Sequence, residues 1–116
     1  MGLLDFFTGV GADYEQTSGE ELLQKISDQG SKNLSIIDVR SAGEYSSGHI
    51  RNARNINVMS SDFGSKVEGL DKSKTYYIVC ASGNRSKTAC GIMKKKGFEK
   101  VVNVRGGMMS WSGPVV

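Results

Sequence analysis

The sequence predicts an α/β fold in which a mostly parallel sheet carries helices on both faces. Two features of the chain predict it. Several short runs are apolar and β-branched almost throughout, as at 34–39 and 75–80, which is typical of strands buried on both faces. Helical patterns alternate with these runs, and this order is expected when helical connections join parallel strands. In such a sheet, ligands bind at the carboxyl ends of the strands.

The individual elements can be predicted in order along the chain. Thr17 or Ser18 caps the start of a helix that ends at Gly30. A strand at 34–39, a helical turn at 42–47, a short strand at 55–58 and a loose helix at 60–70 follow. The second half holds a strand at 75–80, a helix at 84–96, a strand at 101–104 and a last helical turn through Trp111.

Composition limits the classes of function. A chain of 116 residues with 38% hydrophobic content fits one domain with one core. The net charge of +3, from 15 basic and 12 acidic residues, is too mild for nucleic-acid binding and better suits small anionic substrates. Cys80, Cys90 and the single histidine match no zinc pattern, so we expect neither a metal nor a cofactor. Such cysteine usage favours a reducing, cytoplasmic setting.

The N-terminal stretch 1–13 carries a short, interrupted apolar patch. It has neither the basic segment nor the long apolar segment of a signal peptide. No run in the chain approaches the roughly 20 apolar residues needed to span a bilayer, so we expect no membrane span. The apolar side chains of this stretch are expected to pack on the domain or on a neighbouring chain, as in a monomer or weak homodimer. Contact with a membrane surface is a weaker alternative.

The segment 79–86 holds the candidate chemistry. An apolar strand stops at Cys80, and small polar residues lead from it into a helix. In such an arrangement the N–H groups of the loop and the positive end of the helix point to one spot, where they stabilise a thiolate, and a nearby arginine helps. The segment therefore predicts Cys80 as a nucleophile, rather than a small cysteine that merely packs in the core. The predicted binding loop comprises Ala81, Ser82, Gly83, Asn84, Arg85 and Ser86.

Short motifs occur in a definite order along the chain: Asp38-Val39-Arg40, Glu44-Tyr45, Gly48-His49-Ile50, Ala53, Asn55-Ile56, Cys80-x-x-Gly83-x-Arg85-Ser86, Gly106-Gly107 and Trp111. In this order they resemble a single-domain rhodanese over residues 14–116, which leaves 1–13 as an N-terminal arm. The resemblance implies a central five-stranded parallel sheet with helices on both faces, and sulfurtransferase chemistry. Cys80 would take a sulfane sulfur from thiosulfate, polysulfide or a persulfide, hold it as a persulfide, and pass it to a thiol or cyanide acceptor.

The resemblance also bears on residues around the loop. Arg85 would either contact the substrate or turn inward to brace the loop, and both roles stay open. Asp38, with Arg40, is expected to tie its strand end to neighbouring loops rather than to act as a general base. His49 is expected to hold a structural turn rather than to pair with the nucleophile. Cys90 lies about 9 Å further along the helix, too far for a disulfide, and is expected to be semi-buried.

The chain departs from the family pattern at two places. Thiosulfate-specialised rhodaneses commonly carry basic residues directly after the nucleophile, whereas this chain has Ala81 and Ser82, which predicts poor thiosulfate turnover. Arg51 and Asn52 replace the usual Pro and Gly after the Gly-His-Ile turn. Because Asn tolerates left-handed backbone angles, the turn is expected to survive.

Two other classes of function stay open. A phosphatase or arsenate reductase would share the loop design, but the related phosphatases look like Cys-x5-Arg. Here the spacing from Cys80 to Arg85 is the shorter Cys-x4-Arg. A non-catalytic rhodanese-like binding module is disfavoured because the nucleophile and its loop are intact.

Overall fold

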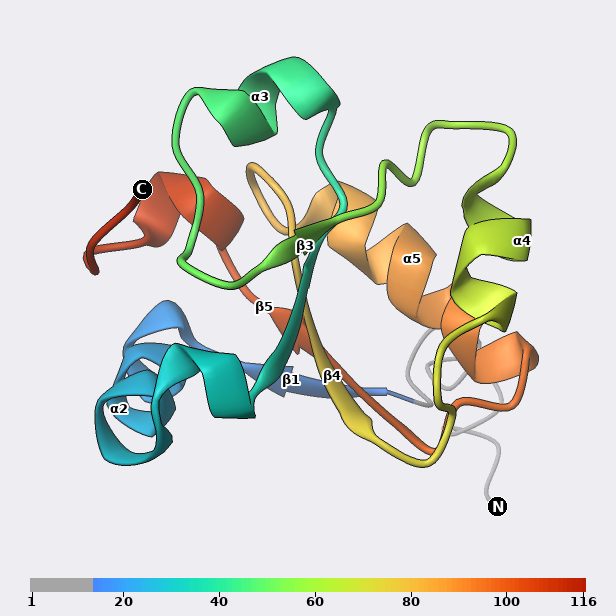
Figure 1. The fold of residues 1–116 in the computed structure, drawn as a ribbon, viewed down its shortest axis with the longest axis horizontal. Helices are drawn as coiled ribbons and strands as arrows, with labels where there is room; N and C mark the ends of the chain where they lie inside the picture. Colours follow the sequence, from blue (N-terminus) through green and yellow to red (C-terminus); the bar gives the residue numbers. More distant parts are fainter. Residues whose placement is uncertain (1–13) are drawn as a thin grey trace, which may run out of the picture.

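The computed structural model describes residues 14–116, which form one five-stranded parallel sheet with helices on both faces (Figure 1). The strands lie in the order β1-β5-β4-β2-β3, and every neighbouring pair is parallel. The predicted fold class is therefore confirmed, together with the strand number that the resemblance implied.

The elements have the following bounds. The strands are β1 (Glu15–Thr17), β2 (Ser35–Asp38), β3 (Arg54–Asn55), β4 (Thr75–Val79) and β5 (Lys100–Val104). The helices are α2 (Gly19–Gln29), α3 (Ala42–Ser46), α4 (Phe63–Glu68) and α5 (Asn84–Lys95), with short 3₁₀ helices η1 (Ser31–Asn33) and η2 (Gly107–Ser110). The predicted N-terminal arm and its packing lie outside the described residues. No helix within 14–116 is long and apolar enough to cross a membrane.

Local hydrogen bonds account for the ends of α2. The Ser18 hydroxyl accepts the N–H of Glu21 at 3.0 Å, and the Glu21 carboxylate accepts the N–H of Ser18 at 3.3 Å. This reciprocal capping box satisfies backbone donors that the first turn of a helix leaves free. Gly30, with φ of 86°, ends the helix. The helix thus begins and ends where the sequence predicts.

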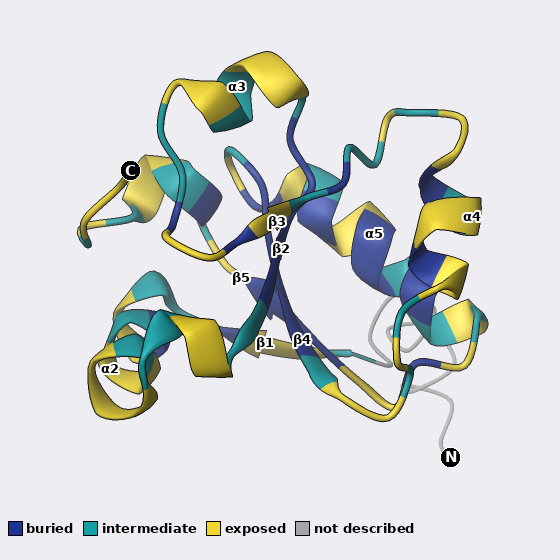
Figure 2. Ribbon diagram, in the orientation of Figure 1, coloured by how far each residue is buried: buried dark blue, intermediate teal, exposed yellow. Residues whose placement is uncertain are grey.

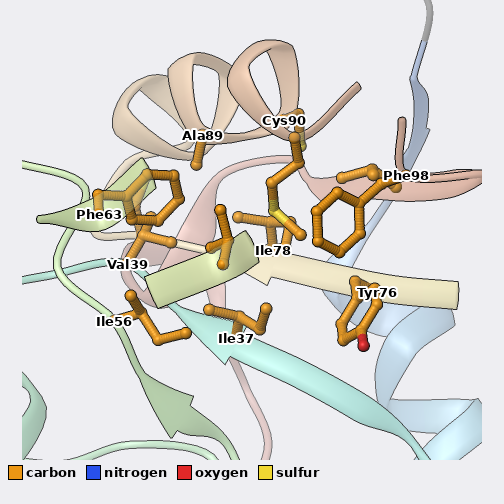
Figure 3. Close-up of a cluster of buried hydrophobic side chains, with 13 residues drawn as sticks. Ile37, Val39, Ile56, Phe63, Tyr76, Ile78, Ala89, Cys90 and Phe98 are labelled. Carbon is orange, nitrogen blue, oxygen red and sulfur yellow. The ribbon is translucent and has the colours of Figure 1, made fainter. Parts of the chain in front are cut away.

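β4 is buried along nearly its whole length (Figure 2), and its side chains alternate between a core on each face of the sheet. Tyr76 and Ile78 pack on one face, in a cluster that includes Ala89 of α5 (Figure 3). Tyr77 and Val79 pack on the other face, in the cluster of Leu22 from α2. This two-sided burial explains why the run is apolar at nearly every position.

Two strand predictions need correction. The residue pattern did not indicate β1, whose residues Glu15–Thr17 are mostly polar and, within residues 14–116, pair only with β5. The strand expected at 55–58 is only Arg54–Asn55. Backbone hydrogen bonds continue past this strand. The N–H of Ile56 donates to the carbonyl of Asp38 at 2.9 Å, and the N–H of Val58 donates to the carbonyl of Val39 at 3.1 Å. β3 lies at the edge of the sheet. The chain after it is no longer a regular strand, but these two backbone hydrogen bonds to the end of β2 and the residue after it are kept.

Three further boundaries differ slightly. β4 ends at Val79, so Cys80 is the first residue of the loop rather than the last of the strand. The helix expected at 60–70 is confined to α4, and Gly69 is its C-cap. α5 ends at Lys95, with Lys96 as its C-cap, one residue before the predicted end. Differences of this size are normal where helix ends fray.

Candidate active site

Cys80 follows β4 at the carboxyl edge of the sheet, where ligands are expected in a parallel sheet. Its side chain is buried, with 0% exposure. Its Sγ accepts the N–H of Gly83 at 3.0 Å and lies 3.3 Å from the Oγ of Ser86. The sulfur therefore sits inside its own loop, next to a backbone donor and a hydroxyl group.

The 3₁₀ helix η2 supports the loop from behind. The N–H of Met108 donates to the carbonyl of Cys80 at 2.8 Å, and the N–H of Met109 donates to the carbonyl of Ala81 at 2.9 Å. Because these carbonyls bond to η2, they point away from the sulfur and the N–H side of the loop is left to face it. Gly107 permits this approach, since a Cβ at its position would lie 2.2 Å from the Cys80 carbonyl oxygen.

Gly83 makes the turn from the loop into α5. It has φ of 98°, a left-handed angle that other residues resist, and it is the N-cap of α5. A Cβ at Gly83 would lie 3.0 Å from the N of Gly106, so the loop and the segment before η2 are closely packed. The glycines of both motifs are therefore needed for the same contact between loop and η2.

The surroundings of Cys80 favour its ionised form. Burial opposes the loss of the proton, because a charge is poorly solvated inside the protein. Hydrogen bonds from the Ser86 hydroxyl and from the N–H groups of Ser86, Gly83 and Ser82 outweigh burial and hold the pKa of the Cys80 thiol below its ordinary value. The thiolate, which is the nucleophilic form, is correspondingly easier to reach.

Arg85, in the first turn of α5, forms an ion pair with Glu44 of α3. Its two terminal nitrogens donate to the two carboxylate oxygens, each at 2.8 Å. These bonds, followed by the backbone N–H of Ser41, lower the pKa of Glu44 to about 2. The same pair raises the pKa of Arg85. Of the two roles left open for Arg85, the structure places it in the bracing contact, which ties α3 to the loop.

Replacing Glu44 by glutamine is expected to weaken the fall of the unfolding free energy as the pH becomes acidic. The carboxylate titrates near pH 4.5 without its partner and at about 2 in the fold, so the pair stabilises the protein above pH 4.5 and is lost as the pH falls toward 2. The Arg85 and Glu44 side chains are 31% and 38% exposed, so screening by solvent limits the contribution to about 1 kcal/mol or less. Urea unfolding between these pH values measures it.

The control for this prediction is Glu99→Gln, which removes an exposed carboxylate outside the loop. It should leave the slope of unfolding free energy against pH close to that of the wild type. An equal slope in Glu44→Gln and wild type would show that the ion pair adds nothing to stability.

Asp38 and Arg40 brace the end of β2. Arg40 donates to the Asp38 carboxylate from Nε at 3.0 Å and from Nη2 at 2.8 Å, and Nη2 also reaches the Gly48 carbonyl at 2.7 Å. The Asn55 amide donates to the backbone carbonyls of Asp38 and Arg40 at 3.0 and 2.9 Å. A buried charge requires such partners. These contacts are of the kind expected for a bracing residue, and none of these hydrogen bonds joins Asp38 to Cys80.

His49 belongs to the turn after α3. Its Nδ1 donates to the Tyr45 carbonyl at 2.9 Å, and the two rings stack with centroids 3.7 Å apart. Its backbone exchanges two hydrogen bonds with Val116, at 3.2 and 2.9 Å. Asn52 takes a left-handed φ of 68°, so the turn survives the replacement of glycine as expected. These contacts are those expected of a residue that holds the turn, and none of them involves Cys80.

Cys90 is a core residue of α5 (Figure 3). The sequence predicted semi-buried packing, but the side chain is completely buried. Burial, followed by the charge of nearby Cys80, raises the pKa of the Cys90 thiol to about 12. A thiol in this state is a poor nucleophile.

A cavity of about 150 Å³, lined mostly by polar residues, opens beside the loop. Its lining comprises Gln16, Ser82, Gly83, Asn84, Lys87, Asn103, Arg105 and Gly106. Two larger hollows, of about 450 and 300 Å³, share Leu34, Ser35 and Lys74 at the starts of β2 and β4, the opposite end of the strands from Cys80. Among residues 14–116, no group of three or more His, Cys, Asp and Glu side chains is placed to hold a metal ion.

Sequence reasoning missed several residues that shape this site. Glu44 belongs to a recognised motif but had no assigned role, and its partner is 41 positions away. The backbone of η2 was not predicted to support the loop, although the Gly106-Gly107 pair signalled a close approach. Asn103 was read only as part of a strand, yet its buried side chain bonds to Ser86. An Asn within a run of valines was the available signal for a buried polar contact.

Comparisons with known proteins lead to one family. The rhodanese-like domain family matches residues 18–114. The chain is 39% identical over 101 residues to "Putative sulfurtransferase YtwF" of Bacillus subtilis, covering 87% of this chain and 93% of that protein. It is 27% identical over 97 residues to a sulfurtransferase of Allochromatium vinosum, covering 84% of this chain and 87% of that one. Among solved structures, a rhodanese-related protein of Thermoplasma volcanium superposes with a TM-score of 0.76 at 33% identity, covering 89% and 98% of the two chains.

Proposed function

This chain belongs to the rhodanese-like domain family, and on that basis we propose that it is a sulfurtransferase in which Cys80 carries the sulfur as a persulfide. The relatives named as sulfurtransferases support such an activity in general. The observation that carries the specific proposal is the position of Sγ, 3.0 Å from the N–H of Gly83 and 3.3 Å from the hydroxyl of Ser86. Such groups stabilise an anionic sulfur in a site from which water is excluded.

The reaction proceeds in two displacements. The Cys80 thiolate attacks the outer sulfur of thiosulfate, polysulfide or a persulfide. The new Sγ–S bond forms as the S–S bond of the donor breaks, and the remainder leaves with the electron pair, as sulfite from thiosulfate, a shorter polysulfide from polysulfide, or a thiolate from a persulfide. An acceptor thiolate, or cyanide, then attacks the terminal sulfur and Cys80 leaves as a thiolate. The sulfur moves without its bonding pair, so no other oxidant or reductant takes part.

Intact mass of the purified protein tests this proposal. After exposure to polysulfide, the mass is expected to rise by one sulfur atom, and cyanide or a thiol is expected to remove it. A protein that gains no sulfur from thiosulfate, polysulfide or a low-molecular-weight persulfide would instead be a non-catalytic binding module.

Donor choice is expected to favour polysulfide or persulfide over thiosulfate. Ala81 and Ser82 place no charge beside the nucleophile to hold the sulfonate end of thiosulfate. Substituting Arg for Ala81 and Lys for Ser82 should raise thiosulfate turnover by about one to two decades, since one charge-assisted contact is worth roughly 1.5 to 3 kcal/mol. Initial rates with each donor measure the change.

Ser65→Lys, an exposed substitution on α4, controls for the added charge and should not alter donor preference. A wild type that already prefers thiosulfate would contradict this prediction. In that case the charge that holds thiosulfate would come from Lys87 and Arg105, which line the cavity next to the loop.

Aryl phosphate hydrolysis and arsenate reduction are expected to be negligible. The Cys-x4-Arg loop is one residue shorter than the loop of the related phosphatases, so it offers less room for a tetrahedral oxyanion. In addition, both terminal nitrogens of Arg85 donate to Glu44, so this guanidinium is not turned toward an oxyanion in the loop. Steady release of phenol from an aryl phosphate that disappears in Cys80→Ser would overturn this expectation.

We further propose that the protein works where thiols are kept reduced, as in the cytoplasm. Its partners would be a small anionic sulfur donor and a thiol acceptor. Both cysteines are free, which fits such a setting. Sedimentation at working concentration tests the expected monomer or weak homodimer.

A further inference from the structure

A line of buried polar groups leads from the sulfur to the cavity beside the loop. Asn103 of β5 shares a sheet face with Val101, which packs in the core under α5, and it is itself 0% exposed. Its Oδ1 contacts the hydroxyl of Ser86, and its Nδ2 donates to the Oε1 of Gln16 at 3.3 Å. β1 and β5 are in register at Gln16 and Asn103, which brings these two side chains together.

The chemistry of these groups fixes the direction of each hydrogen bond while Cys80 is a thiol. An amide oxygen only accepts, so the single proton of the Ser86 hydroxyl goes to Asn103. The oxygen of Ser86 is then left to accept the S–H of Cys80 at 3.3 Å. All donors therefore point from the sulfur toward Gln16.

An anionic sulfur reverses this requirement. A thiolate or persulfide has no proton to donate, so the Ser86 hydroxyl must turn its proton toward the sulfur. Asn103 Oδ1 would then be left buried without a donor, which is costly. A half-turn of the Asn103 amide presents Nδ2 to Ser86 and Oδ1 to Gln16. Because Gln16 is exposed and borders the cavity, its own amide can turn and donate Nε2–H.

We propose that Ser86, Asn103 and Gln16 form a relay whose hydrogen bonds reverse direction when the Cys80 sulfur becomes anionic. Asn103 is a positioning residue in this relay, since it acts on the sulfur only through Ser86. The relay rests on the proposed function for its purpose: the attacking thiolate and the persulfide that it forms are both anionic, so the reversed orientation is the one in which sulfur transfer takes place.

Charged groups near the relay also affect the ionisation of the Cys80 sulfur, and the test must separate their effect from that of the relay. Arg85 interacts electrostatically with the Cys80 sulfur from α5. Lys87 and Arg105 line the cavity with Gln16, and Cys90 is the other ionisable group that senses the charge of Cys80. These charges act through space, whereas the relay requires Ser86 and Asn103.

Alkylation of Cys80 by iodoacetamide across pH, followed by intact mass, reports the thiolate without any sulfur transfer. Gln16→Glu offers only acceptors and holds Asn103 in the orientation suited to the thiol. Gln16→Lys offers only donors and holds the reverse orientation, while Gln16→Met is the neutral reference. We expect alkylation at a pH below the thiol pKa to be about threefold to tenfold faster in Gln16→Lys than in Gln16→Glu.

The same pair of variants in an Asn103→Leu background separates the relay from plain charge. With the relay broken, the ratio of rates is expected to fall below about twofold. If Asn103→Leu does not fold, Ser86→Ala serves as the second background, since it removes the hydroxyl and leaves the strand intact. A ratio that stays unchanged in these backgrounds overturns the relay.

The outcomes also distinguish this inference from the proposed function. A wild type that takes up no sulfur, yet shows the expected alkylation ratios, overturns sulfur transfer and supports the relay. Normal sulfur uptake, together with a ratio of alkylation rates that is unchanged in Asn103→Leu and Ser86→Ala, supports sulfur transfer and overturns the relay.

Discussion

Replacing Cys80 by serine is expected to reduce sulfur uptake from polysulfide to below detection. The serine hydroxyl would occupy the same loop, but it stays protonated at neutral pH and is a weak nucleophile without an adjacent base. The only histidine, His49, stacks on Tyr45 and bonds to its carbonyl, and it makes no hydrogen bond to residue 80 in the described structure. Intact mass and cyanide-dependent thiocyanate release measure the loss.

Cys90→Ala is the matched control, because Cys90 is the only other cysteine of the chain. Burial raises the pKa of its thiol to about 12, and it packs in the core, so its removal should leave sulfur uptake at one atom per chain. Sulfur uptake by Cys80→Ser, or its loss in a folded Cys90→Ala, would contradict the assignment of the nucleophile.

Gly107→Ala is expected to damage both the fold and the loop. The new Cβ would lie 2.2 Å from the Cys80 carbonyl oxygen, so η2 must move away from the loop that it supports. The left-handed φ of 53° adds about 1 to 2 kcal/mol for a residue other than glycine. We expect a loss of at least about 2 kcal/mol in unfolding free energy. Because a displacement of about 1 Å at a reacting group costs roughly a hundredfold in rate, sulfur uptake should slow by a similar factor.

Gly91→Ala tests whether these effects belong to the position. Gly91 lies within α5, and a Cβ there meets no atom within 4 Å. Alanine should stabilise this helix by about 0.5 to 1 kcal/mol and leave sulfur uptake unchanged. If Gly107→Ala lost stability but took up sulfur at the wild-type rate, η2 would have no part in shaping the loop.

The features that could be predicted from the sequence depend on residues close together in the chain. The capping box at Ser18, the stop at Gly30 and the strand–loop–helix around Cys80 each involve only a few consecutive residues. Backbone geometry and hydrogen bonding within such a segment are largely local, so the residue types suffice to indicate them. The apolar run of β4 likewise indicated a strand buried on both faces, since burial demands apolar side chains on each side.

What the sequence could not decide depends on partners brought together by the fold. β1 is a polar triplet that becomes a strand only because the free edge of β5 pairs with it. Arg85 could have faced the substrate, but Glu44, 41 positions away, holds it in a bracing contact. Asn103 lies 17 positions from Ser86 and 87 from Gln16, so no local pattern reveals their contact. The sequence by itself determined the fold class and the strand–loop–helix that holds Cys80, the predicted nucleophile. Only the tertiary structure decided which side chains surround them, because a hydrogen bond or an ion pair forms only where packing places both partners within reach.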